Sequence, residues 1–217
     1  MAHAKMSGQI FISYRREDSA ASAGRLFDRL SSHFLSNQIF MDVDSIDLGE
    51  NFVETIGETV GSCDVLIAVI GKSWLTSCDQ KGQRRLDNAD DFVRLEIATA
   101  LKRDIRVIPV LVDGASMPQS RDLPDDLRDL VRRNALQLSH DRFRTDSERL
   151  QSAVSRALEK TASERRDRKP PPAQDKVIKA ALVKGFSDIY LNPTSRLLDS
   201  SLRVRIIGGY DLGLQER

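Results

Sequence analysis

Short apolar runs alternate with longer amphipathic segments along most of the chain. The runs are rich in β-branched residues and have the length of strands, and five of them stand at residues 10–14, 39–41, 65–70, 107–112 and 135–138. The unbroken run VLIAVI at residues 65–70 is typical of a strand that is buried on both faces of a parallel sheet. Pro109 has no N–H to donate, so it favours an edge or irregular position for the strand at residues 107–112.

The segments between these runs have helical periodicity. In residues 19–34, Ala23, Leu26, Leu30 and Phe34 recur on one face, and charged residues fill the other face. Further helices are expected at residues 52–60, 90–101, 125–133 and 146–159. Strands that alternate with helices predict an α/β fold with a five-stranded, doubly wound parallel sheet and a site at the carboxyl ends of its strands.

The composition changes after residue 160. Charged residues and three consecutive prolines fill the sequence SERRDRKPPPAQ, which predicts a solvated linker at residues 161–175. The linker would join a domain at residues 8–160 to a short segment at residues 176–217. In that segment apolar residues alternate with arginines from Leu202 onward, as in a half-buried strand, so we expect a small α+β unit there.

Charge and cysteine usage exclude several classes of function. Lysine and arginine number 33 against 32 acidic residues, so the whole chain has no charge excess to attract nucleic acid or a membrane surface. Cys63 and Cys78 have no paired spacing with histidines, which argues against a zinc site or a disulfide framework. The longest apolar run is too short to span a bilayer, and the start has no secretory signal. We therefore expect a cytoplasmic protein without a bound metal.

A partial phosphate-loop motif at Gly71, Lys72 and Ser73 does not predict a nucleotide site. The pattern G-x-x-x-x-G-K-[ST] requires a glycine at position 66, where this chain has Leu66 inside a predicted strand. A loop that wraps a phosphate is therefore not expected.

Glu96 is the strongest candidate for chemistry on residue grounds. The helix DDFVRLEIATALKR has an apolar stripe, and Glu96 lies at its edge, four residues after Phe92 and on the same side of the helix. A partly desolvated carboxylate is costly unless it has donors, and such groups concentrate at functional sites. The alternative is a surface ion pair with Lys102 or Arg103.

Five segments together resemble a Toll/interleukin receptor (TIR) domain. They are FISYRRED, FMDVDSIDLGENF, DFVRLEIATAL, IPVLVDG and LQLSHDRF, in this order along the first domain. The chain is most similar to the NAD-cleaving bacterial type of TIR protein. The resemblance implies a flavodoxin-like fold, an NAD+ nucleosidase activity, and NAD+ as substrate with no resident cofactor.

The resemblance also assigns roles to residues near the reaction. Glu96 matches the catalytic glutamate, and Phe92 stands where the enzymes often have tryptophan. Phenylalanine can stack on a flat ring, but it has no indole N–H to donate. Trp74 is as consistent with packing as with a site, and His140 has no local partner that would define a role, so neither is assigned to catalysis.

Further matches concern substrate binding. Tyr14, Arg15 and Arg16 follow the first strand in the loop that borders the nucleotide in the family, and arginines suit a pyrophosphate; the alternative is a solvated loop. Phe52 matches an aromatic residue near the dinucleotide, and the alternative is a core residue.

Two kinds of function follow from the resemblance. One is an enzyme that releases nicotinamide and gives ADP-ribose or a cyclic isomer, activated by self-association in signalling or antiviral defence, with an upstream activating protein. The other is an adaptor that acts only by TIR–TIR assembly. In both cases the resemblance implies contact through the loop from Val43 to Asn51, where Ile46 and Leu48 could be anchors. The glutamate at position 96 favours the enzyme.

The C-terminal segment has a resemblance of its own. AALVKGFSDIYLNPTSRLLDSSLRVRIIGGYDL is similar to the N-terminal region of type II secretion and pilus ATPases, although the motor domain with its phosphate loop is absent. It departs from that pattern at Tyr190 and Gly209. An interaction module, a sensor fragment or an oligomerisation arm would each fit.

Overall fold

A computed structural model describes residues 8–41 and 52–167, and it describes side chains in the second range from residue 55 onward. The chain divides into two units, Met1–Arg168 and Lys169–Arg217, and every described residue belongs to the first. The loop at residues 43–51 and the C-terminal segment at residues 176–217 lie outside the described residues. So do the last residues of the predicted linker.

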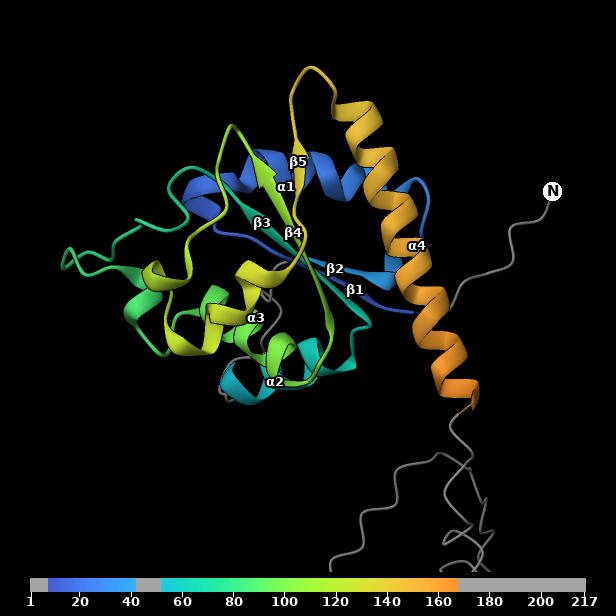
Figure 1. Ribbon diagram of the computed structural model, residues 1–217, viewed down its shortest axis with the longest axis horizontal. Helices are drawn as coiled ribbons and strands as arrows, with labels where there is room; N and C mark the ends of the chain where they lie inside the picture. The colour runs from blue at the N-terminus through green and yellow to red at the C-terminus, as the bar shows by residue number, and fades with distance from the viewer. Residues whose placement is uncertain (1–7, 42–51, 168–217) are drawn as a thin grey trace, which may run out of the picture. The chain divides into compact units, whose positions relative to one another are not determined.

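The described unit contains one five-stranded parallel sheet (Figure 1). Its strands are β1 (Ile10–Ser13), β2 (Ile39–Met41), β3 (Val65–Ile70), β4 (Arg106–Val112) and β5 (Leu136–Leu138). They lie in the order β2-β1-β3-β4-β5, and every neighbouring pair is parallel. The predicted α/β class, the parallel sheet and its doubly wound, flavodoxin-like topology are confirmed.

Four α-helices cover the two faces of the sheet (Figure 1). They are α1 (Arg16–Ser31), α2 (Phe52–Ser62), α3 (Phe92–Lys102) and α4 (Phe143–Asp167). Alternate residues of β3 divide between two buried clusters, because successive side chains of a strand point to opposite faces. Leu66 and Ala68 pack with α2 and α3, whereas Val65 and Ile67 pack with α1 and α4. The central strand is therefore buried on both faces, as VLIAVI predicts.

The position of Pro109 differs from the expectation. β4 lies between β3 and β5, so the prediction of an edge strand is wrong. However, β5 pairs only with Val110, Leu111 and Val112, and β4 has no strand partner on that side at Pro109. A residue without an N–H is tolerated where one side of the strand has no partner.

Two helical segments also differ from the pattern. The segment expected as a helix at residues 125–133 is a 3-10 helix, Asp125–Arg132, in which Leu127 and Leu130 are buried at a spacing of one 3-10 turn. α4 runs to Asp167, past the predicted domain end at residue 160. The described part of the charge run that suggested a linker, residues 163–167, is the exposed end of this helix, and Lys160 pairs with Glu164 there at i,i+4.

The sheet brings several loops to one edge. The segment after β1, the segment after β3 and the start of α3 all lie at the carboxyl ends of the strands, where doubly wound folds hold their ligands. No helix in the described part of the chain has the length and apolar character needed to cross a membrane.

Candidate active site

Glu96 is a buried carboxylate on the first part of α3. The helix starts at Phe92, and the side chain of Asp91 caps it by accepting a 3.1 Å hydrogen bond from the N–H of Arg94. Val93 and Ile97 belong to the buried core. Glu96 lies between them in the helix, and it is 7% exposed. A solvated surface ion pair therefore does not describe Glu96.

Phe92 occupies the opposite environment on the same turn of α3. It is 52% exposed, although large apolar side chains are usually covered. Phe92 precedes Glu96 by one helical turn, so an exposed ring and a buried carboxylate lie on one side of the helix. This pair can offer a flat apolar surface next to a negative charge.

A buried ion pair connects the end of β1 to the start of α3. The guanidinium of Arg15 donates from its two terminal nitrogens to both carboxylate oxygens of Asp91, at 2.9 and 3.0 Å. The Arg15 and Asp91 side chains are only 2% and 8% exposed. Planar, two-point pairing of this kind restricts both side chains. Asp91 thus caps α3 and anchors it to the sheet at the same time.

A second carboxylate fixes the loop that follows β3. Asp18 accepts hydrogen bonds from the backbone N–H groups of Gly71 at 2.9 Å and Ser73 at 2.7 Å. A Cβ atom at position 71 would overlap the Asp18 carboxylate, so glycine permits this approach. The amides of the partial phosphate-loop motif therefore hold a carboxylate of the protein itself, which agrees with excluding that motif as a nucleotide site.

The segment before α3 has its own restraints. Arg94 contacts both carboxylate oxygens of Asp126 at 3.1 and 3.2 Å and also donates to the carbonyl oxygens of Leu86 and Asp87. Leu86 is fully buried in the core. These contacts join the start of α3 to the 3-10 helix at Asp125–Arg132 and limit movement of the helix that carries Glu96.

The other predicted binding residues lie in different environments. Tyr14 is half-buried and packs against the cluster beneath α1, and Arg16 is exposed as the first residue of α1. Arg15 was expected to contact phosphate, but its guanidinium is buried and paired with Asp91. Phe52 begins α2, and its side chain lies outside the description. The Arg15–Asp91 pair brings the segment after β1 next to the start of α3.

Asp91 and Asp18 are the residues that the sequence interpretation missed. Asp91 carries a detectable signal, because an aspartate directly before an apolar-periodic segment is a typical helix cap. Its pairing with Arg15, at a separation of 76 residues, has no local signal. The same is true of Asp18 and Gly71, which are 53 residues apart.

Three other candidate side chains, those of Trp74, His140 and Cys63, lie outside this cluster. Trp74 is 1% exposed and belongs to the core, which confirms packing, and His140 is exposed beside Arg25. Burial raises the pKa of the Cys63 thiol to about 12, so its reactive thiolate is scarce near neutral pH. No group of acidic, histidine or cysteine side chains among the described residues could hold a metal ion.

The fold and the carboxyl-edge arrangement define a flavodoxin-like α/β domain, and comparison with known proteins identifies its family. The model of the TIR domain matches residues 10–154. The chain belongs to the TIR domain family.

Two relatives are named NAD(+) hydrolases. The chain is 30% identical over 132 residues to NAD(+) hydrolase SARM1 of Danio rerio and 25% identical over 132 residues to NAD(+) hydrolase sarm1 of Drosophila melanogaster. Each alignment covers 61% of this chain but only 17% and 9%, respectively, of the relatives. The chain therefore spans less than a fifth of the length of either relative.

Similar solved structures also contain TIR domains. One is a metazoan TIR-STING receptor from C. gigas in complex with 2',3'-cGAMP, at 19% identity and a TM-score of 0.46, which covers 73% of this chain and 41% of the receptor chain. Another is the TIR domains of the activated Roq1 resistosome, at 15% identity and a TM-score of 0.45, covering 73% and 99% of the two chains.

Proposed function

We propose that this TIR domain cleaves the nicotinamide–ribose bond of NAD+ and that Glu96 is its catalytic residue. The observation that carries the proposal is the burial of Glu96 on a helix whose start is anchored to the sheet by Asp91 and Arg15. The similarity to two proteins named NAD(+) hydrolases supports NAD+ as the substrate. NAD+ is consumed in this proposal, so no resident cofactor is required.

A carboxylate is the group that this reaction requires. Nicotinamide in NAD+ is a cationic pyridinium, and it departs as a neutral molecule with the electron pair of the broken C–N bond. Positive charge then develops on the ribose, as in the oxocarbenium-like transition state of glycoside cleavage. The negative charge of Glu96 stabilises that charge directly or by accepting hydrogen bonds from the ribose hydroxyls. No general acid is needed for departure.

The second half of the reaction determines the product. When water attacks the anomeric carbon, its oxygen forms the new bond, one proton is released, and the product is ADP-ribose. When a nucleophilic atom of the adenosine part attacks instead, the product is a cyclic isomer. The carboxylate of Glu96 serves both routes, because both pass through the same charged ribose.

The binding roles follow from exposure and pairing. The exposed ring of Phe92 supplies a stacking surface for a flat ring of the substrate. The exposed residue Arg16 is the proposed pyrophosphate contact, with Tyr14 beside it. Arg15 acts as a positioning residue, because both its terminal nitrogens are used by Asp91. The family match also leaves Phe52 as a proposed contact near the dinucleotide.

The proposed setting is a cytoplasmic signalling or defence protein activated by self-association through the loop from Val43 to Asn51 or by an upstream protein. Purified chain should release nicotinamide from NAD+, with a specific rate that rises with protein concentration or on enforced dimerisation. Chromatography would identify nicotinamide together with ADP-ribose or a cyclic isomer. An adaptor would instead self-associate without turnover, and that result under both conditions would refute the proposed activity.

A further inference from the structure

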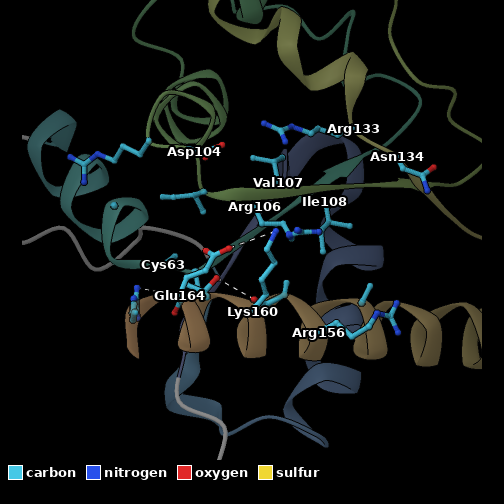
Figure 2. A pocket seen from close by; sticks show the side chains of 18 residues that line it. Cys63, Asp104, Arg106, Val107, Ile108, Arg133, Asn134, Arg156, Lys160 and Glu164 are labelled. Atoms are coloured by element: carbon cyan, nitrogen blue, oxygen red, sulfur yellow. Dashed lines mark hydrogen bonds and ion pairs between the residues drawn. The ribbon is translucent and has the colours of Figure 1, made fainter. Parts of the chain in front are cut away.

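A cavity of about 980 Å³ lies at the amino-end edge of the sheet, beside α4 (Figure 2). It is bounded by the segments that lead into β3, β4 and β5 and by one side of α4. These segments are at the amino ends of the strands, whereas Glu96 and Arg15 lie toward the carboxyl ends. The cavity is therefore distinct from the proposed catalytic site.

The lining of this cavity is dominated by cations. Six cationic side chains face three carboxylates, and the cations are Arg103, Arg106, Arg133, Arg156, Lys160 and Arg165. Figure 2 shows Arg106 and Lys160 between the start of β4 and α4, with Arg156 farther along the same helix. Repulsion between cations around one cavity destabilises the folded domain. A bound anion would reduce this repulsion, so the arrangement favours anion binding.

The carboxylates do not neutralise this excess. Asp64 is bound by Arg165 at 2.7 Å and by the backbone N–H of Gln9 at 2.9 Å, and Glu164 lies 3.7 Å from Lys160. The other four cations of the lining, all arginines, form no ion pair with a described residue. The third carboxylate, Asp104, is exposed at the rim.

One of these arginines has a buried donor without a partner. The Nε atom of Arg133 is inaccessible to solvent and makes no hydrogen bond among the described residues. Such a donor is costly to leave unpaired. Arg106 enters the same cavity from β4, and the apolar side chains of Val107, Ile108 and Ala157 form part of its wall. The cavity thus combines several guanidinium groups with a limited apolar surface.

We propose that this cavity binds a small molecule that carries two or more phosphate groups. Guanidinium groups match phosphate oxygens in geometry and charge, and several phosphates are needed to balance four arginines that pair with no carboxylate in the described part of the chain. The apolar wall would contact the organic part of the ligand. The volume falls in the range of small-molecule sites, about 300–1,000 Å³. This proposal does not depend on NAD+ cleavage.

Calorimetric titration of the full chain would test the proposal with tripolyphosphate, ATP and adenosine as probes. We expect tripolyphosphate and ATP to bind, with a Kd that rises with salt concentration, and adenosine not to bind. The double variant Arg106→Gln/Arg156→Gln should weaken binding of both phosphates by about tenfold or more, because it removes charge-assisted contacts. Both positions are exposed, so folding should be retained.

The matched control is Arg121→Gln/Arg144→Gln, which makes the same charge change at two exposed positions outside the cavity. It should leave both Kd values within about twofold of the unmodified chain, since distant exposed charges are screened. Arg16→Gln should also retain binding, which separates this cavity from the catalytic site, where Arg16 is the proposed pyrophosphate contact. Equal losses of affinity in both double variants would overturn the proposal. It would also be overturned if the unmodified chain bound neither phosphate compound, including the case in which the cavity variant lost self-association instead.

Discussion

Arg15 and Asp91 form a two-point ion pair that is buried at both ends and joins the end of β1 to the cap of α3. The pair places the start of α3 relative to the sheet, and Glu96 lies within the next turns of that helix. Its consequences can be measured as both stability and turnover.

Asp91→Ala should lower the free energy of unfolding by about 3–5 kcal/mol, because it leaves the buried Arg15 charge without its partner and also removes the helix cap. Urea denaturation would measure the loss. Asp125→Ala is the control, since it removes a carboxylate that is 86% exposed and paired at i,i+3 with Arg128. A similar small effect of both substitutions would show that the Arg15–Asp91 pair does not hold the domain together.

Glu96→Gln should reduce nicotinamide release by about a hundred- to a thousand-fold, because it removes the charge that stabilises the ribose cation with little change in shape. The exposed residue Glu148 supplies the control, and Glu148→Gln should keep full activity. Thermal unfolding and gel filtration would verify that both variants are folded and self-associate equally. Near-normal turnover by a folded Glu96→Gln variant would show that another residue is catalytic.

Phe92→Ala should raise KM with a smaller effect on kcat, because stacking on the substrate ring contributes to binding in the ground state and the transition state alike. The side chain is 52% exposed, so the melting temperature should change little. Phe92→Trp should lower KM, since the indole adds surface and an N–H donor. Steady-state kinetics would measure both variants, and an unchanged KM in Phe92→Ala would exclude Phe92 from substrate binding.

Gly71→Ala should destabilise the domain by about 1–3 kcal/mol, because the added Cβ overlaps the carboxylate of Asp18 that holds the loop after β3. The matched substitution Gly24→Ala meets no atom within 4 Å inside α1. It should stabilise the helix by about 0.5–1 kcal/mol. Chemical denaturation would measure the free energy of unfolding of both variants. A change in the same direction in both would contradict the expected overlap with Asp18.

Hydrophobic periodicity along the chain was enough to predict the class of fold, because it shows which side chains avoid water. The run at Val65–Ile70 identified the central strand, and the helical spacing around Glu96 identified α3. The capping role of Asp91 was missed, because the predicted helix began at residue 90, although an aspartate directly before an apolar-periodic segment is a typical cap. These features depend on contacts between residues close in the chain or on burial alone.

Contacts between groups far apart in the chain became visible only in three dimensions. The pairing of Arg15 with Asp91 depends on how β1 and α3 meet at one edge of the sheet, and it places the guanidinium that was expected to contact phosphate against a protein carboxylate. The arginines at the opposite edge that form no ion pair with a described residue are separated in sequence. Arg106 and Arg156 line one cavity because α4 contacts β3 and β5, the strands on either side of β4. Local sequence patterns do not predict such long-range contacts, because these contacts depend on strand order and helix placement across the whole domain.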